Sequence, residues 1–136
     1  MKLLIVDDEE TIVAFFTALA RGQGQVDIDT AGTGEEALAR VLRKTYDLIT
    51  LDINMPGVSG LEIIAMLRNM NPHAIIAIVS GYLPEEFPSE VANCADLMLP
   101  KPVSVATFNQ LLASAGQIRQ VMDQIRQLGV SPATLN

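Results

Sequence analysis

Short aliphatic runs alternate with amphipathic segments along most of this 136-residue chain. Four of these runs are nearly continuous, as strands covered on both faces require, whereas the second alternates apolar and acidic residues and suits a half-exposed sheet edge. Strands that alternate with helices predict a parallel α/β sheet with helices on both faces. The expected strands are KLLIVD (2–7), QVDIDT (25–30), YDLITLD (46–52), HAIIAIVS (73–80) and ADLMLP (95–100).

Helical periodicity fills the gaps between these runs. Thr33 with Glu36, and Ser59 with Glu62, have the spacing of capping boxes and mark two of the helix starts. The apolar spacing predicts helices over 9–21, 34–44, about 60–70, and from about 104 onward.

Composition and charge argue against several kinds of protein. The formal net charge of −7 repels phosphate backbones and anionic lipid, so we expect no direct nucleic-acid or membrane binding. No stretch approaches the roughly 18 uncharged apolar residues of a membrane-spanning helix. The single cysteine, Cys94, excludes an internal disulfide, fits a reducing cytoplasm and is expected as a buried structural thiol.

The pattern changes after Ala115. Apolar residues recur every three to four positions from Ile118 to Leu128, which suits either a longer last helix with a frayed tail or a helix that forms a homodimer. Two heptads are too few to decide between them. The expected organisation is one domain over 1–115, followed over 116–136 by a helical extension or a linker to an absent output domain.

Chemistry-bearing residues follow the ends of four expected strands. Asp7 and Asp8 follow the first, Asp52 the third, Ser80 the fourth and Lys101 the fifth. Taken singly, each suits a helix cap, a turn or a surface position. Ligands of open parallel sheets bind at these strand ends, however, so the side chains should meet. Clustered carboxylates repel one another, and a hard cation such as Mg²⁺ removes that cost.

This combination predicts phosphoryl transfer with Asp52 as the nucleophile, because a metal, an ammonium and a hydroxyl can neutralise and bind phosphoryl oxygens. The turn at 55–57 should direct the chain away and leave a carboxylate oxygen exposed. Gly57 and Gly60 should let that loop bend tightly before its helix.

Four segments carry a family resemblance, namely VDDEE (6–10), LDINMPGVSG (51–60), IVSGY (78–82) and LPKPV (99–103). In order and spacing they resemble the signature segments of response-regulator receiver domains, over about residues 1–115. The resemblance implies a (βα)5 flavodoxin-like three-layer sandwich with strand order 2-1-3-4-5. It also implies a cytoplasmic two-component protein that accepts a phosphoryl group from a phosphohistidine donor. That donor would be a sensor histidine kinase or a histidine phosphotransfer protein.

The same resemblance implies that the chain is not an enzyme, apart from catalysing its own aspartyl phosphorylation and dephosphorylation. It also implies a role for each site residue. The peptide bond between Lys101 and Pro102 is expected to be cis. The roles are phosphoacceptor for Asp52, Mg²⁺ ligands for Asp7, Asp8, Asp52 and the backbone carbonyl of Asn54, switch hydroxyl for Ser80, and phosphate-binding lysine for Lys101.

The chain departs from the family near its output face. Most members carry Tyr or Phe three residues before the lysine, where this chain has Met98, so the usual aromatic switch does not transfer directly. Pro84 and Pro88 predict a loop through 81–87 and a short fourth helix beginning near Pro88. The site chemistry is therefore predicted from the sequence, and the output geometry is not.

Two other readings compete with a phosphorylatable receiver. A Mg²⁺-dependent phosphohydrolase also uses an aspartyl nucleophile, but that class has a second Asp two residues on, where this chain has Asn54, and needs room for a substrate domain. A receiver-like interaction module that is not phosphorylated usually lacks an acidic residue or the lysine, and both are present here.

Overall fold

A computed structural model describes residues 1–81 and 88–135 of the chain. Its centre is a five-stranded parallel sheet with the order β2-β1-β3-β4-β5. This is the parallel α/β sheet that the sequence pattern predicts, in the (βα)5 flavodoxin-like architecture and strand order that the family resemblance implies. The strands are β1 (Lys2–Val6), β2 (Asp27–Ala31), β3 (Leu48–Leu51), β4 (Ile75–Ser80) and β5 (Leu97–Pro100).

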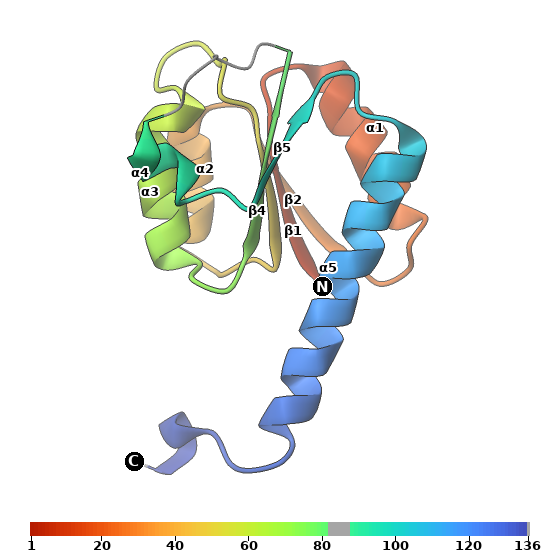
Figure 1. Ribbon diagram of the computed structural model, residues 1–136, viewed down its shortest axis with the longest axis vertical. Helices are drawn as coiled ribbons and strands as arrows, with labels where there is room; N and C mark the ends of the chain where they lie inside the picture. Colours follow the sequence, from red (N-terminus) through yellow and green to blue (C-terminus); the bar gives the residue numbers. More distant parts are fainter. Residues whose placement is uncertain (82–87, 136) are drawn as a thin grey trace.

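Helices cover both faces of the sheet and make three layers (Figure 1). One face packs against α1 and α5, where the rings of Phe16 and Phe108 stack with their centroids 4.1 Å apart. The other face packs against α2, α3 and α4. The helices are α1 (Glu10–Arg21), α2 (Gly34–Val41), α3 (Gly60–Met70), α4 (Ser89–Ala92) and α5 (Val105–Arg126), with a short 3₁₀ turn at Pro132–Leu135.

The predicted capping boxes have different outcomes. Thr33 caps α2, since its Oγ1 accepts a hydrogen bond from the backbone N–H of Glu36 at 3.1 Å. Ser59 does precede α3, but its side chain makes no capping hydrogen bond, so the second box is wrong. The fifth helix begins instead with an unpredicted cap, in which Ser104 Oγ accepts from the N–H of Thr107 at 3.1 Å.

The fourth crossover and the fifth strand differ from the other repeats. The short helix α4 begins directly after Pro88, as predicted, and the loop expected through 81–87 lies, apart from Gly81, outside the described residues. The sequence pattern suggests that β5 is covered on both faces, and this is wrong: Met98 in β5 is 46% exposed. The reason is that β5 is an edge strand and α4 has only four residues. Cys94 is half-buried rather than fully buried, and its Sγ donates to the Glu90 carbonyl at 3.0 Å.

The last helix continues well past the sheet (Figure 1). Its last buried residue is Ala115, and the helix continues from there to Arg126, beyond the domain. Arg119 ties this projecting part to the domain, since its Nη1 lies 3.0 Å from Oδ1 of Asp47 at the start of β3. Among the helices of the described chain, none is long and apolar enough to cross a membrane.

Candidate functional site

Backbone hydrogen bonds fix the positions of the predicted site residues at one edge of the sheet. The N–H of Asp7 donates to the Ala31 carbonyl of β2 at 3.0 Å, and the N–H of Asp52 donates to the Val6 carbonyl of β1 at 2.9 Å. The N–H of Lys101 donates to the Ser80 carbonyl of β4 at 2.9 Å. The hydrogen bonds between neighbouring strands thus continue one residue beyond β1, β3 and β5. They hold Asp7, Asp52 and Lys101 at the carboxyl ends of these strands.

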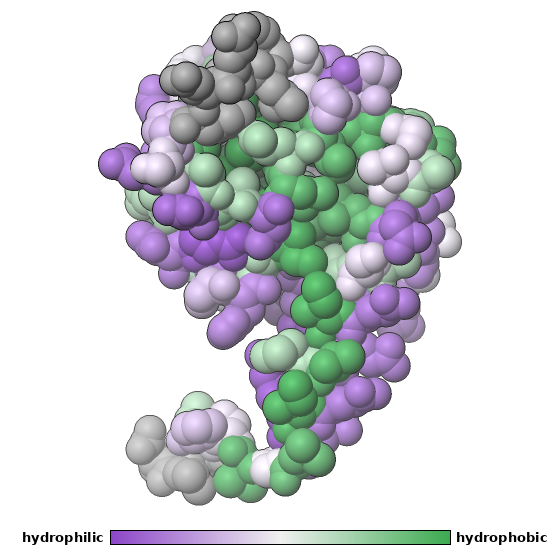
Figure 2. Space-filling view, viewed as in Figure 1, coloured by the Kyte–Doolittle hydropathy of each residue, from purple (hydrophilic) through white to green (hydrophobic). Residues whose placement is uncertain are grey.

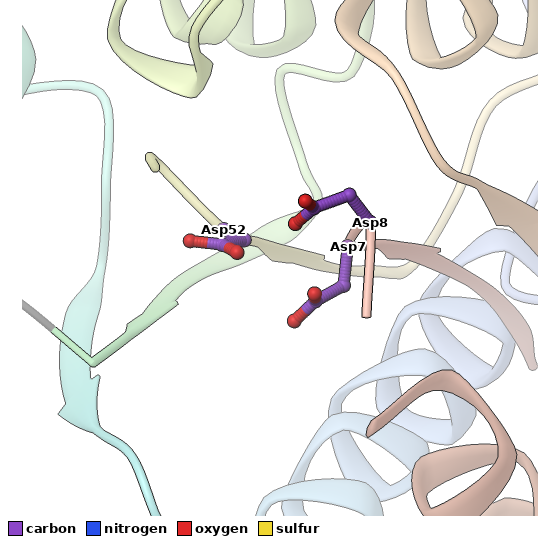
Figure 3. A group of neighbouring side chains, drawn as sticks. All are labelled: Asp7, Asp8 and Asp52. Atoms are coloured by element: carbon purple, nitrogen blue, oxygen red, sulfur yellow. The ribbon is translucent and has the colours of Figure 1, made fainter. Parts of the chain in front are cut away.

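The three aspartates meet as predicted. One carboxylate oxygen from each of Asp7, Asp8 and Asp52 lies within 4.8 Å of the others (Figure 3). Asp7 and Asp52 are each only 3% exposed, whereas Asp8 is exposed. Burial raises the pKa of Asp7, although its hydrogen bond with Lys101 and one from the N–H of Glu9 act in the opposite direction.

Lys101 lies directly on these carboxylates. Its Nζ is 2.8 Å from Asp7 Oδ2, 3.0 Å from Glu9 Oε1 and 3.3 Å from Asp52 Oδ2. Burial alone would lower the pKa of Lys101, but hydrogen bonds to Asp7 and Glu9 outweigh it and raise the pKa. The ammonium therefore stays charged and offsets part of the negative charge. Glu9 was not among the predicted site residues, although the acidic run VDDEE contained it.

Ser80 and Asn54 form the second part of the site. Ser80 is fully buried, and its Oγ accepts a hydrogen bond from Asn54 Nδ2 at 3.0 Å. The backbone N–H of Asn54 donates to Asp52 Oδ1 at 2.9 Å. Asn54 thus joins the acidic cluster to Ser80, with its backbone N–H on Asp52 and its side-chain amide on Ser80. The Mg²⁺-ligand role that the resemblance gives to its backbone carbonyl stays a prediction.

The turn after Asp52 is present, but its geometry corrects two expectations. Gly57 has φ +78°, a left-handed conformation that suits glycine. Gly60 serves close packing rather than bending, because a Cβ there would lie 2.6 Å from the Asp52 carbonyl oxygen. The Asp52 side chain is also less open than expected, because Lys101 lies against it.

Met98 lies apart from the acidic site. It is half-exposed on β5 and lines a hollow of about 180 Å³ together with Ile78 of β4 and Val91 of α4. The hollow lies between α4 and β5. Tyr82, in the third signature segment, lies outside the described residues.

The donor set at the strand ends suits a hard divalent cation. Asp7, Asp8 and Asp52 bring three carboxylates together against the one ammonium of Lys101. Mg²⁺ prefers such oxygen ligands and keeps several waters, which the exposed position of Asp8 allows. These residues can therefore hold Mg²⁺ and bind a phosphoryl group beside it.

A family model described as the response regulator receiver domain matches residues 3–113. The chain belongs to this family. The fold is thus that of a receiver domain of two-component response regulators. The phosphohydrolase reading of the sequence has no support from this match.

Curated relatives of this receiver domain are longer proteins. The response regulator ArlR of Staphylococcus saprophyticus is 38% identical over 79 residues, which cover 58% of this chain and 36% of ArlR. The sensor protein EvgS of Escherichia coli is 29% identical over 131 residues, which cover 96% of this chain and 11% of EvgS. The receiver domain described here therefore spans well under half of either relative.

Solved structures of receiver proteins superpose well on this one. The response regulator TrrA of Thermotoga maritima, in complex with Mg²⁺ and BeF, gives a TM-score of 0.72 at 32% identity, covering 84% of this chain and 97% of TrrA. A response regulator of Burkholderia pseudomallei with a phosphorylated aspartic acid and a calcium ion gives a TM-score of 0.74 at 25% identity, covering 89% and 72% of the two chains.

Proposed function

We propose that this receiver domain accepts a phosphoryl group on Asp52. The observation that carries the proposal is the convergence of Asp7, Asp8, Asp52 and Lys101 at one sheet edge. Asp52 is the central member, because it follows β3 in the middle of the sheet and its carboxylate accepts hydrogen bonds from both Asn54 and Lys101. A backbone fixed in this way holds the nucleophile in place before the donor arrives.

In the transfer step, a carboxylate oxygen of Asp52 forms a bond to phosphorus as the phosphorus–nitrogen bond of a phosphohistidine breaks. The bonding electron pair stays on the imidazole nitrogen of the donor, which takes up a proton. Lys101 moves from the carboxylates to a phosphoryl oxygen and offsets part of the charge of the aspartyl phosphate, which is about −2 in place of the single charge of the carboxylate. Its charged state, maintained by Asp7 and Glu9, is the one this role requires.

Mg²⁺ would be held by Asp7, Asp8, Asp52 and the backbone carbonyl of Asn54. When bound, it would neutralise phosphoryl oxygens and the crowded carboxylates. Asp7 would contribute a buried carboxylate oxygen and Asp8 an exposed one, so the ion would be bound on one side by the protein and would remain open to water on the other.

Ser80 and Met98 are proposed to transmit the phosphorylated state. A phosphoryl oxygen on Asp52 attracts the Ser80 hydroxyl, which can donate to it while its oxygen accepts the hydrogen bond from Asn54. A charge-assisted hydrogen bond contributes about 1.5–3 kcal/mol, and two or three of them approach the roughly 5.5 kcal/mol that inverts a 1:99 equilibrium. The hollow beside Met98 gives the thioether side chain room to move when β4 and β5 shift.

The donor is proposed to be a sensor histidine kinase or a histidine phosphotransfer protein, and the similarity to part of the sensor protein EvgS supports this class of partner. We propose the cytoplasm as the compartment, and residues 1–115 as the receiver domain with 116–136 as an extension or linker. The end of the buried face of α5 at Ala115 supports this division.

Intact-mass spectrometry after incubation with Mg²⁺ and acetyl phosphate tests the phosphoacceptor. We expect one added phosphoryl group on the wild-type protein, none on Asp52→Asn, and one on the control Asp27→Asn, which alters an exposed carboxylate away from the site. An adduct that persists in Asp52→Asn would assign the acceptor elsewhere. No adduct on a wild-type protein that still binds Mg²⁺ by calorimetry would favour the unphosphorylated interaction module. Turnover of external phosphomonoesters would favour a phosphohydrolase.

A further inference from the structure

An apolar stripe runs along the projecting half of α5 on the side facing the viewer in Figure 2. It consists of Ile118, Val121, Ile125 and Leu128, which are 49%, 52%, 54% and 86% exposed. Leu128 continues the last turn of the helix, because its N–H donates to the Ile125 carbonyl at 3.1 Å. Large aliphatic side chains exposed in a row on one helix face mark a surface that binds a partner.

The spacing of the stripe is that of a two-stranded coiled coil. The steps of three, four and three residues place Ile118 and Ile125 at a positions and Val121 and Leu128 at d positions of a heptad. β-branched residues at a with Leu at d favour parallel dimers, and the two Ile residues and Leu128 follow this pattern, whereas Val121 at d does not. The same side of α5 continues over the domain with Leu111, which lies with Leu97 and Leu99 of β5 around an apolar depression, so the stripe does not end at the domain edge.

Charge indicates that the partner of the stripe is a second copy. The positions that flank it are uncharged, since Gln117 and Gln124 occupy g positions and Met122 an e position. A coiled-coil partner chosen by charge needs charged e and g residues, whereas a self-pairing surface must avoid like charges. On a molecule with a net charge of −7, a neutral stripe is where two copies can approach without opposing carboxylates.

The charged residues of this part of α5 lie on another side of the helix. Arg119 pairs with Asp47 at 3.0 Å and with Asp123 at 3.1 Å, and Arg126 lies 3.4 Å from Asp123. Arg119 and Asp123 line a crevice between α5 and the base of the domain rather than the stripe. These contacts, together with the buried first half of α5, hold the helix in place before any partner binds. Dimerisation therefore does not have to nucleate a helix.

We propose that two copies of this chain pair through the stripe, with their α5 helices parallel and in register. The dimer has twofold symmetry, so each stripe residue faces its own counterpart. This inference goes beyond the proposed phosphoryl chemistry and does not depend on it. The stripe is smaller than a standard protein interface, so we expect a dissociation constant on the order of tens of micromolar.

Sedimentation equilibrium from about 5 to about 500 µM, with no phosphodonor present, tests the pairing. We expect a monomer–dimer equilibrium for the wild-type protein and an increase in Kd of about 100-fold or more for Val121→Glu, which buries a charge in the interface. The matched control is Gln120→Glu, which adds the same charge to an exposed neighbour that lines the crevice, and it should leave Kd nearly unchanged. Far-UV circular dichroism checks that α5 stays helical, and Ile125→Glu serves as a second stripe variant.

Disulfide cross-linking tests the orientation. In a Cys94→Ser background, Val121→Cys and Leu128→Cys should each form a disulfide-linked dimer on mild oxidation, because parallel helices in register bring both positions close to their counterparts. Antiparallel helices can do so at no more than one of the two positions. A wild-type protein that stays monomeric at every concentration, or a dimer that survives both Glu variants, would overturn the interface. Cross-linking at one position alone would overturn the parallel arrangement.

Discussion

Replacing Lys101 by Met removes the ammonium that lies on the acidic site. The resulting loss in the free energy of unfolding depends on how deeply this group and its carboxylate partners are buried. The Lys101 side chain is 11% exposed, and those of Asp7 and Asp52 are 3% exposed. Removing one partner of such a buried pair costs about 3–5 kcal/mol, because the remaining charges lose their compensation. Glu9 is 54% exposed and adds little. Protonation of Asp7, whose pKa burial already raises, limits the loss, so we expect about 3 kcal/mol near neutral pH.

Urea denaturation followed by far-UV circular dichroism, with EDTA or with Mg²⁺, measures this loss. In the wild-type protein the Lys101 ammonium competes with Mg²⁺ for the Asp7 carboxylate, and in the variant this competition is absent. Added Mg²⁺ should therefore reduce the difference in the free energy of unfolding between variant and wild type by at least about 1 kcal/mol. Lowering the pH should narrow the gap too, because a protonated carboxyl needs no cation.

The control for this experiment is Lys44→Met. Lys44 also pairs with two aspartates, Asp27 and Asp29, at 3.0 Å and 2.8 Å, but its side chain is 30% exposed. Its removal should cost about 1 kcal/mol or less and should not respond to Mg²⁺. If Lys101→Met costs no more than this control, or if Mg²⁺ leaves the gap unchanged, then Lys101 does not balance a metal-binding acidic cluster.

Three further predictions concern the elements around the site. Gly60→Ala should lower the free energy of unfolding by about 1–3 kcal/mol, because its Cβ meets backbone, while Gly116→Ala, which has open space in α5, should raise it by up to about 1 kcal/mol. Ser104→Ala removes the cap of α5 and should lower the melting temperature, with a cost of about 1 kcal/mol. The hydrogen bond from Lys44 lowers the pKa of Asp29 below its ordinary value of 3.8. The ionised carboxylate therefore adds to the free energy of unfolding at pH values above 3.8, and this contribution is lost as the pH falls through the lowered pKa. Asp29→Asn should therefore cost about 1 kcal/mol in urea titrations near pH 6 and almost nothing near pH 3.

The chemistry of the site could be predicted because it depends on local order along the chain. Asp7, Asp52 and Lys101 each come directly after an aliphatic run, and parallel strands bring their carboxyl ends to one edge whatever the details of packing. Glu9 was missed, because nothing in an acidic run shows which carboxylate will reach a lysine 92 residues further along the chain.

The sequence by itself determined the five strands, the parallel sheet, the turn at Gly57 and the residues of the acidic cluster. Each of these depends on a short stretch of chain, because the hydrophobic period, the glycine and the residue that ends a strand can all be read from neighbouring positions. Only the tertiary structure decided that Lys101 covers Asp52, that Gly60 lies against its backbone, and that Asn54 hydrogen-bonds Ser80. It also decided that the stripe on α5 faces away from the domain. These features depend on the distance between residues far apart in the chain, and such distances are set by how helices and strands pack rather than by the residues alone.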